Sequence, residues 1–307
     1  MPIRTALAVL FFLLPIGALA DATLTGWMSD PALTEVSGMA ASHAHPGTLW
    51  VENDSNNPAA IYAVGPGGTL RATVSIDGAP NIDWEDLASF DLDGRHYLLL
   101  ADTGDNGGIR KTLALHVIEE PKDLRDGHAR PAWSIAFRWP DGPRDCEAVA
   151  VDVRTGSILL ITKKRVPAQL FRLPLRPTAS NATKSDVLTA ELLGTLTGIP
   201  QPTPDEIAAA PHYAKYLSQV TAVDIAPDRG SIAVLTYRRL YLYRRGSDEH
   251  ADYKSWAQAL SHEPQQISFG WLPQAEALAF ARDGRNVYIS GEHLPAPIMQ
   301  VSIPPTH

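Results

Sequence analysis

Cysteine is almost missing from this chain, because Cys146 is the only one among 307 residues. A single cysteine excludes an intramolecular disulfide and a zinc site built from cysteine pairs. Its acidic neighbours disfavour a thiolate, so we expect Cys146 to be a buried structural residue. An excess of basic residues is also missing, since 26 Lys and Arg stand against 34 Asp and Glu. Nucleic acid is therefore not an expected partner, because binding it needs a basic face.

Several catalytic signatures are absent as well. The sequence has no Gly-x-Ser-x-Gly elbow, no His-Glu-x-x-His pair, and no glycine loop that would bind phosphate between a strand and a helix. The chemistries that depend on these motifs therefore find no support here.

Only the first residues are strongly apolar over a long run. Arg4, the apolar run of residues 6–18 and the small residues around Ala20 predict a signal peptide over residues 1–20. The rest contains no run of transmembrane length. We therefore expect no transmembrane segment and a periplasmic or secreted protein. Residues 21–307 suit a single domain, and we expect a monomer.

One sequence unit recurs five times. Each copy has a polar start, an apolar stretch, a turn with glycine, and a second apolar stretch that ends in polar residues. The starts are Glu35-Val36-Ser37, Asp83-Trp84-Glu85, Asp145-Cys146-Glu147, Gln219-Val220-Thr221 and Gln274-Ala275-Glu276. Hairpins repeated at this period are typical of a β-propeller. We expect an all-β fold, a five-bladed β-propeller, with Trp84 packed between blades one and two.

The ends of the chain predict how the ring closes. The last repeat lacks a fourth strand, and residues 22–28 resemble the fourth strands of other repeats. We expect this N-terminal segment to complete the last blade, which leaves no unpaired inner edge. Residues 188–196 and 266–271 are the expected fourth strands of blades three and four. Short helices are expected in blade four after Thr203 and over residues 252–260. A sixth blade within residues 174–218 is the alternative.

Antiparallel pairing brings the polar starts and ends of the repeats to one face, around the central channel. Blades one, two and five supply mostly acids and amides there, whereas blades three and four supply cations. The predicted pocket therefore has an acidic and a basic side. Crowded carboxylates repel one another unless protons or a cation intervene, and oxygen ligands suit Ca²⁺ or Mg²⁺.

This arrangement predicts candidate residues for three roles. The candidate metal ligands are Glu85, Glu147, Glu276, Asn53 and Asp102, and the candidate catalytic residues are Glu147 and His293. The candidates for binding an anion are Lys163, Lys164, Arg238 and Arg239. The alternative interpretation is a structural ring of polar residues in a wet channel, with ordinary solvated charges in its loops.

Several motifs in the first half of the mature chain resemble those of an uncharacterised family of secreted bacterial β-propeller proteins. They are Ser37-Gly38-Met39-Ala40, the run from Leu49 to Ser55, the run from Asp83 to Ala88, the run from Asp102 to Asn106, and the run from Arg144 to Ala148. More remotely, the layout is similar to phytase-like esterase propellers and to gluconolactonase and paraoxonase propellers. That similarity implies a divalent metal, often calcium, at the channel mouth.

The sequence as a whole favours a secreted, metal-dependent hydrolase of esterase or phosphoesterase type. Its expected cofactor is a divalent metal, calcium first, and its expected substrate is a small anionic molecule. The alternative function is a non-catalytic binding or assembly propeller in the periplasm, whose partner would be a periplasmic protein.

Overall fold

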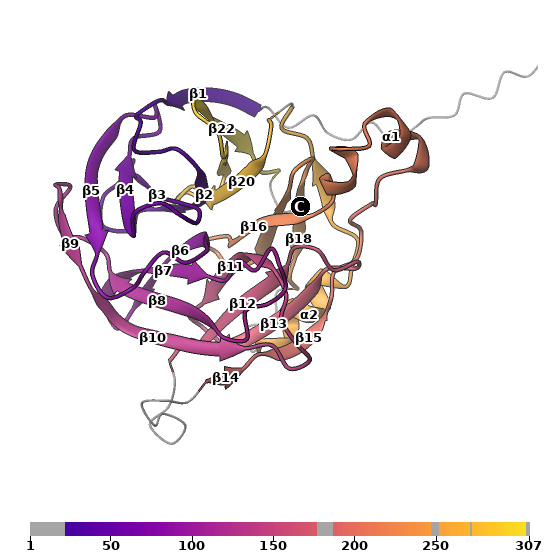
Figure 1. Ribbon diagram of the computed structural model, residues 1–307, viewed down its shortest axis with the longest axis horizontal. Coiled ribbons are helices and arrows are strands. Elements are labelled where there is room, and N and C mark those ends of the chain that lie inside the picture. Colours follow the sequence, from indigo (N-terminus) through magenta and orange to yellow (C-terminus); the bar gives the residue numbers. More distant parts are fainter. Residues whose placement is uncertain (1–21, 177–186, 247–251, 271, 305–307) are drawn as a thin grey trace, which may run out of the picture.

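The computed structural model of the protein describes residues 22–176, 187–246, 252–270 and 272–304. Five small sheets stand around a common axis, each with its first strand innermost (Figure 1). This arrangement confirms the predicted five-bladed β-propeller. The predicted signal peptide, residues 1–20, lies outside the described residues. Among the described helices, none combines the length and the apolar character needed to cross a membrane.

The first two blades each carry a fifth strand. In order from the axis, blade one consists of β2 (Val36–Ala41), β3 (Leu49–Asn53), β4 (Ala60–Val64), β5 (Leu70–Ile76) and β9 (Gly127–Ala129). Blade two consists of β6 (Trp84–Leu92), β7 (Arg95–Asp102), β8 (Leu113–Glu119), β10 (Pro131–Arg138) and β14 (Leu188–Thr189). The added strands β9 and β14 pair in parallel with β5 and β10, whereas the other strand pairs of these two blades are antiparallel.

The remaining three blades have four strands each. Blade three consists of β11 (Cys146–Asp152), β12 (Ser157–Thr162), β13 (Gln169–Pro174) and β15 (Glu191–Thr195). Blade four consists of β16 (Val220–Ile225), β17 (Ser231–Thr236), β18 (Leu240–Arg244) and β19 (Gln265–Ile267). Blade five consists of β20 (Ala275–Phe280), β21 (Asn286–Gly291), β22 (Ala296–Ser302) and β1 (Ala22–Met28).

The ring closes through the N-terminal segment, as predicted. Strand β1 pairs antiparallel with β22, from Ala22 opposite Val301 to Met28 opposite Ala296. The innermost strands β20 and β2 also contact each other, so the first blade in sequence meets the last. Pairing between the two ends of the chain leaves no open inner edge at the junction.

One predicted strand divides between two blades. Residues 188–196 were expected as the fourth strand of blade three, but Leu188 pairs with Phe137 of blade two, and only β15 pairs with β13. The chain thus crosses from one blade to the next within a few residues, which a short apolar pattern does not reveal. Among the described residues of 174–218 no further hairpin exists, so the six-bladed alternative is wrong.

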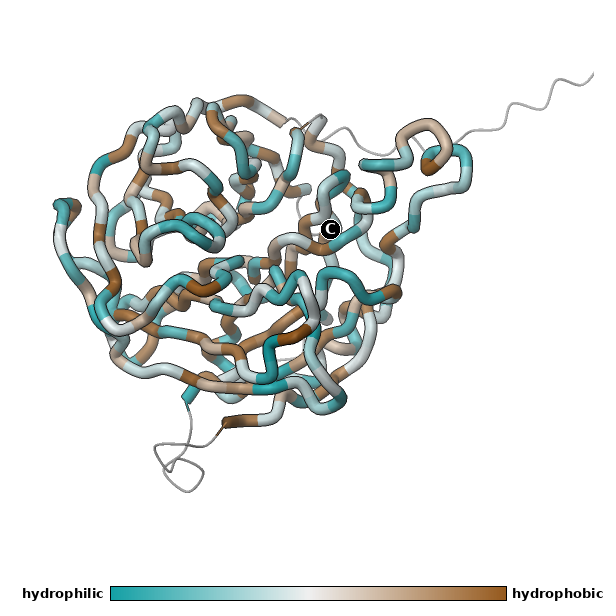
Figure 2. The backbone as a smooth tube through the Cα atoms, in the orientation of Figure 1, coloured by the Kyte–Doolittle hydropathy of each residue, from teal (hydrophilic) through white to brown (hydrophobic). Residues whose placement is uncertain are grey.

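The core lies between the blades, in five apolar clusters that each join two neighbours. Trp50 and Trp84 are fully buried together between blades one and two, as expected for Trp84. Because each sheet is covered on both faces, its inner strands are apolar on both sides, and Figure 2 shows these apolar segments inside the ring.

Both predicted helices occur, but only α2 lies within blade four, between β18 and β19, whereas α1 lies in the connection between blades three and four. Thr203 and Glu206 form the expected capping box before α1 (Pro204–Ala209), with the Glu206 amide donating to Thr203 Oγ1 at 3.2 Å. A short 3₁₀ helix follows at Ala214–Tyr216. Helix α1 extends away from the ring (Figure 1). Helix α2 (Lys254–Leu260) buries Trp256 and packs against β15 and β18.

Candidate functional site

The innermost strand of every blade has a β-bulge near its start. In each blade the pairing with the second strand shifts by one residue at the same place in the repeat. The residues left without a partner are Ser37, Glu85, Glu147, Thr221 and Glu276. A bulge redirects a side chain and ends regular pairing. We call the end of the channel where these five residues lie the acid mouth.

Two of the five bulged residues connect neighbouring blades. Ser37 Oγ donates to the carbonyl oxygen of Glu85 at 2.8 Å, and Thr221 Oγ1 donates to that of Ala275 at 2.7 Å. These hydroxyl groups are buried and engaged with backbone. Ionisable side chains at the bulges therefore come only from blades two, three and five.

The three bulged glutamates are almost completely buried, with exposed fractions of 3 % for Glu85, 3 % for Glu147 and 7 % for Glu276. Burial raises the pKa of Glu85 well above its ordinary value, and the charges of Glu147 and Asp54 raise it further. Burial and then the charge of Glu292 raise the pKa of Glu276 to about 7. The acid mouth therefore concentrates negative charge that protons or a cation must balance.

Lys163 lies among these acids. Its ammonium group forms an ion pair with Glu147, and its side chain is only 10 % exposed. Although burial lowers the pKa of Lys163, the charges of Glu147, Tyr237 and Glu276 outweigh it and raise this pKa above its ordinary value. The predicted separation into an acidic and a basic side is wrong at this position, because β12 ends next to the start of β11 and carries its lysine into the acidic cluster.

Two groups of three carboxylates lie close enough to share a cation. One consists of Asp54, Asp83 and Glu85, and the other of Glu85, Asp145 and Glu147. Within each group one oxygen from every residue lies within 4.8 Å of the others. In the second group Lys164 Nζ already approaches Asp145 Oδ2 at 2.9 Å, and Lys163 neutralises Glu147. The first group has no such cation among the described ion pairs.

The first group fits a hard divalent cation. Glu85 Oε1 is buried and has no hydrogen-bond partner among the described residues. Gly104 leaves room beside it, because a Cβ there would lie 2.2 Å from Glu85 Oε1 and 2.5 Å from Asp83 Cγ. Burial, followed by the charge of Asp54, raises the pKa of Asp83 to about 6. An all-oxygen ligand set of this kind suits Ca²⁺ or Mg²⁺.

Two predicted metal ligands make other contacts. Asn53 Nδ2 donates to the carbonyl oxygen of Ala32 at 2.7 Å, and Asp102 Oδ1 lies 2.8 Å from Arg110 Nη2. Neither residue belongs to the two carboxylate groups. Their role as ligands stays a prediction, as does that of Glu276, which accepts a hydrogen bond from Tyr237 Oη at 2.6 Å.

Three other predicted residues of blades four and five make contacts outside the two carboxylate groups. Arg238 Nη1 lies 2.8 Å from Glu206 Oε1, so this guanidinium group anchors α1. The amide of Arg239 donates to Thr236 Oγ1 in the turn after β17. The side chain of His293 is 65 % exposed and lies 4.0 Å from the Glu292 carboxylate. The structure thus brings Glu85, Glu147 and Lys163 together, and it leaves Arg238, Arg239 and His293 at the rim.

A cavity of about 380 Å³ adjoins the acid mouth. Lys163 and Tyr237 form its inner wall, and its other lining residues are Asn106, Lys164, His212, Tyr213, Tyr216, Gln219 and Gln274. The sequence did not identify Tyr213, Tyr216, Tyr237 or Asp54 as site residues. Tyr237 occupies the same place after β17 as Lys163 does after β12, so the repeat itself carried the signal.

No family model matches the sequence, and no curated protein matches it. Among solved structures, the chain is similar to the major allergen Mala s 1 of Malassezia sympodialis. The two share 15 % sequence identity over 92 % of this chain and 78 % of the allergen, with a TM-score of 0.48.

Proposed function

We propose that the protein is a divalent-metal-dependent hydrolase of esterase or phosphoesterase type, with its site at the acid mouth and Ca²⁺ as its metal. One observation carries the proposal, namely the buried Glu85 carboxylate, whose Oε1 has no hydrogen-bond partner among the described residues and lies within reach of Asp54 and Asp83. An unpaired buried carboxylate is costly unless a cation satisfies it. As the N-terminal sequence predicts, the protein would act in the periplasm or outside the cell.

Each residue of the mouth has a role in this proposal. Asp54, Asp83 and Glu85 would hold the cation, which when bound would polarise an ester or phosphoester oxygen. Lys163 and Lys164 line the adjoining cavity and would bind an anionic substrate. Glu147 would take a proton from the attacking water on Oε2, while Lys163 holds Oε1.

The cavity indicates which substrates the site would accept. Tyr213 and Tyr216 have exposed fractions of 41 % and 39 % and face the same space as both lysines. Partly exposed aromatic rings next to cations favour a small substrate that joins an anionic group to a planar or apolar part. A cavity of about 380 Å³ is too small to enclose a polymer completely.

A second function is favoured by the ion pair of Lys163 with Glu147. Because this lysine balances part of the charge without any metal, the mouth also suits a non-catalytic binding or assembly propeller. Its ligand would then occupy the lysine and tyrosine cavity and no turnover would occur.

Metal analysis combined with an activity panel separates the two functions. The mature protein is purified without chelator, its metals are measured, and hydrolysis of p-nitrophenyl esters and phosphates is followed. The hydrolase should lose turnover in EDTA, regain it with Ca²⁺, and lose most of it in Glu85→Gln. Glu119→Gln, at an exposed ion pair with Arg95, is the matched control and should retain turnover. A metal-free protein without turnover would favour the binding function.

A further inference from the structure

The opposite end of the channel, which we call the turn face, carries a second group of metal-ligand side chains. His43 follows β2, while Asp91 and His96 are direct partners across the β6–β7 hairpin. The turn face thus joins side chains from blades one and two that no sequence motif connects. One ligand atom from each of the three residues lies within 4.8 Å of the others.

The imidazole rings converge on one carboxylate oxygen. Asp91 Oδ1 lies 2.7 Å from His43 Nδ1 and 2.5 Å from His96 Nδ1. The side chain of His43 is only 7 % exposed, and its Nε2 has no hydrogen-bond or ion-pair partner among the described residues. Buried imidazole nitrogens are normally satisfied by a hydrogen bond or a metal.

The turn that carries His43 is held firmly. The backbone amides of His43 and Ala44 donate to Glu120 Oε2 at 3.2 and 3.1 Å, and Trp50 Nε1 donates to Glu120 Oε1 at 2.8 Å. Glu120 itself is 3 % exposed. A buried carboxylate thus positions the ligand turn through its backbone, as outer partners of metal sites do for their ligands.

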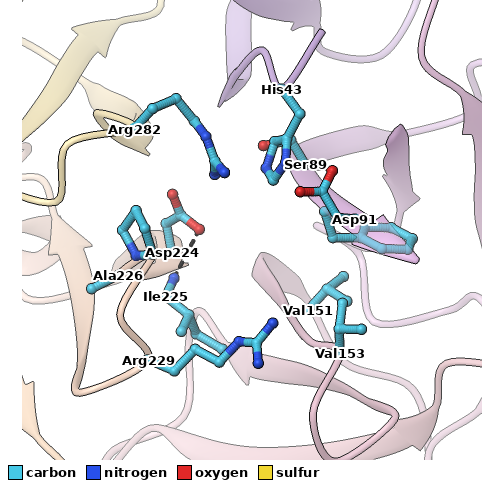
Figure 3. Close-up of a pocket in the computed structure, with 12 residues that line it drawn as sticks. His43, Ser89, Asp91, Val151, Val153, Asp224, Ile225, Ala226, Arg229 and Arg282 are labelled. Atoms are coloured by element: carbon cyan, nitrogen blue, oxygen red, sulfur yellow. Dashed lines mark hydrogen bonds and ion pairs between the residues drawn. The ribbon is translucent and has the colours of Figure 1, made fainter. Parts of the chain in front are cut away.

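A cavity of about 200 Å³ lies beside His43 and Asp91 (Figure 3). Arg282 and Arg229 also line this cavity (Figure 3). Neither guanidinium group forms a hydrogen bond or an ion pair with another described residue. Both oxygens of Asp224 accept backbone amides, from Ile225 and Phe280, each at 2.8 Å. Both oxygens of this carboxylate are therefore engaged with the backbone of blades four and five.

From this geometry we infer that His43, Asp91 and His96 form a binding site for a transition metal, Zn²⁺ by ligand type, with an open position toward the cavity. Two imidazoles and one carboxylate are a ligand set that Zn²⁺ accepts, whereas Ca²⁺ prefers oxygen alone. The site is distinct from the acid mouth in its chemistry, and does not depend on the proposed hydrolase. A bound ion would also join blades one and two at the turn face.

The test is a titration of the purified, tag-free mature protein with ZnCl₂ by calorimetry, and with CoCl₂ by visible absorption. Wild type should bind one Zn²⁺ at this site and give the absorption of a low-coordinate cobalt complex. His96→Gln and Asp91→Asn should each weaken this binding by at least about tenfold, since even the loss of an outer partner costs about 10- to 100-fold. Circular dichroism checks that both variants fold.

Two controls separate this site from others. His128→Gln removes an exposed histidine that pairs with Asp77 at 3.2 Å but has no third ligand, so Zn²⁺ binding should be unchanged. Glu85→Gln alters the acid mouth and should also leave this Zn²⁺ binding unchanged. Zn²⁺ binding that is absent in wild type, or that persists in folded His96→Gln and Asp91→Asn, would overturn the inference.

Discussion

The two ends of the channel are built from different parts of the same repeat. At the acid mouth the side chains come from the bulges of the inner strands, and the three glutamates there are 7 % exposed or less. At the turn face they come from hairpin turns and strand ends, where Asp91 and His96 are 53 % and 45 % exposed at the side chain. Position in the repeat thus determines whether charge is buried or solvated.

The difference in burial between the two ends of the channel also decides which charged side chains need a partner. At the acid mouth an unpaired carboxylate has no water to stabilise it, so a lysine or a bound cation must do so. On the turn face, solvent stabilises the exposed Arg229 and Arg282, which form no ion pair with any described residue. Substitutions should therefore change stability strongly at the acid mouth and weakly on the turn face. Substitutions of His43 and Asp224, which are less exposed than the arginines of the turn face, should have intermediate effects.

The largest loss of stability is expected for Lys163→Met. The substitution leaves Glu147 buried without its cation, and removal of one partner from a buried pair costs about 3–5 kcal/mol. Glu147 would then keep its proton to higher pH in the folded state than in the unfolded state. Its ionisation therefore costs stability as pH rises, and the loss should be smaller at pH 5 than at pH 8.

Urea unfolding at both pH values measures this effect. Lys122→Met is the control, because the Lys122 side chain is 86 % exposed and its removal should change stability by less than about 0.5 kcal/mol. An equal, small loss in both variants would show that the acid mouth does not depend on Lys163.

The next largest effect concerns metal affinity, which should change independently at the acid mouth and at the turn face. Glu85→Gln should weaken Ca²⁺ binding by at least about tenfold, equal to about 1.4 kcal/mol, and leave Zn²⁺ binding unchanged. His96→Gln should do the reverse. Calorimetric titration of each variant with each ion gives four affinities. If either variant lost affinity for both ions to the same extent, the two faces would not hold independent sites.

A smaller effect is expected from the pH dependence of Asp224. Burial raises the pKa of Asp224 to about 7, although the residue retains some solvent contact. Between pH 4 and pH 7 the folded state holds a proton that the unfolded state has lost, so this contribution to stability falls as pH rises. The stability advantage of wild type over Asp224→Asn should shrink by about 1–2 kcal/mol between pH 5 and pH 8.

Thermal and urea unfolding at several pH values would reveal this change. Asp123→Asn, at a side chain that is 63 % exposed, is the control and should follow wild type throughout. A constant difference between wild type and Asp224→Asn at all pH values would contradict the raised pKa.

The smallest effect is expected for Arg229→Ala on the turn face. Because this guanidinium group is exposed and has no hydrogen-bond or ion-pair partner in the described part of the chain, stability should change by less than about 0.5 kcal/mol. Urea unfolding measures the change. A loss above about 1 kcal/mol would show that Arg229 has a stabilising contact in the folded state.

The acid mouth was more predictable from sequence than the turn face. The repeated polar starts gave the blades, the ring closure and the convergence of Glu85 with Glu147, because regular pairing follows from the repeat. The bulges themselves leave no residue signature, so the depth of burial and the contact of Lys163 with Glu147 could not be foreseen. Asp54 is not among the metal ligands that the sequence predicts, because its approach to Asp83 depends on how two blades pack.

The three candidate ligands of the turn face do not recur from one repeat to the next. His43 belongs to the turn after β2, and Asp91 and His96 belong to another blade. Their proximity arises only when blades one and two pack through Trp50 and Trp84. The division of residues 188–196 between two blades has a similar cause, since the register of outer strands is set by tertiary contact.

The most direct test of the central claim is anomalous X-ray scattering from crystals soaked with Mn²⁺ in place of Ca²⁺. A peak surrounded by Asp54, Asp83 and Glu85, absent in Glu85→Gln crystals, is the result we predict. Crystals without a peak at these carboxylates, or with the same peak in Glu85→Gln, would contradict a cation site at the acid mouth.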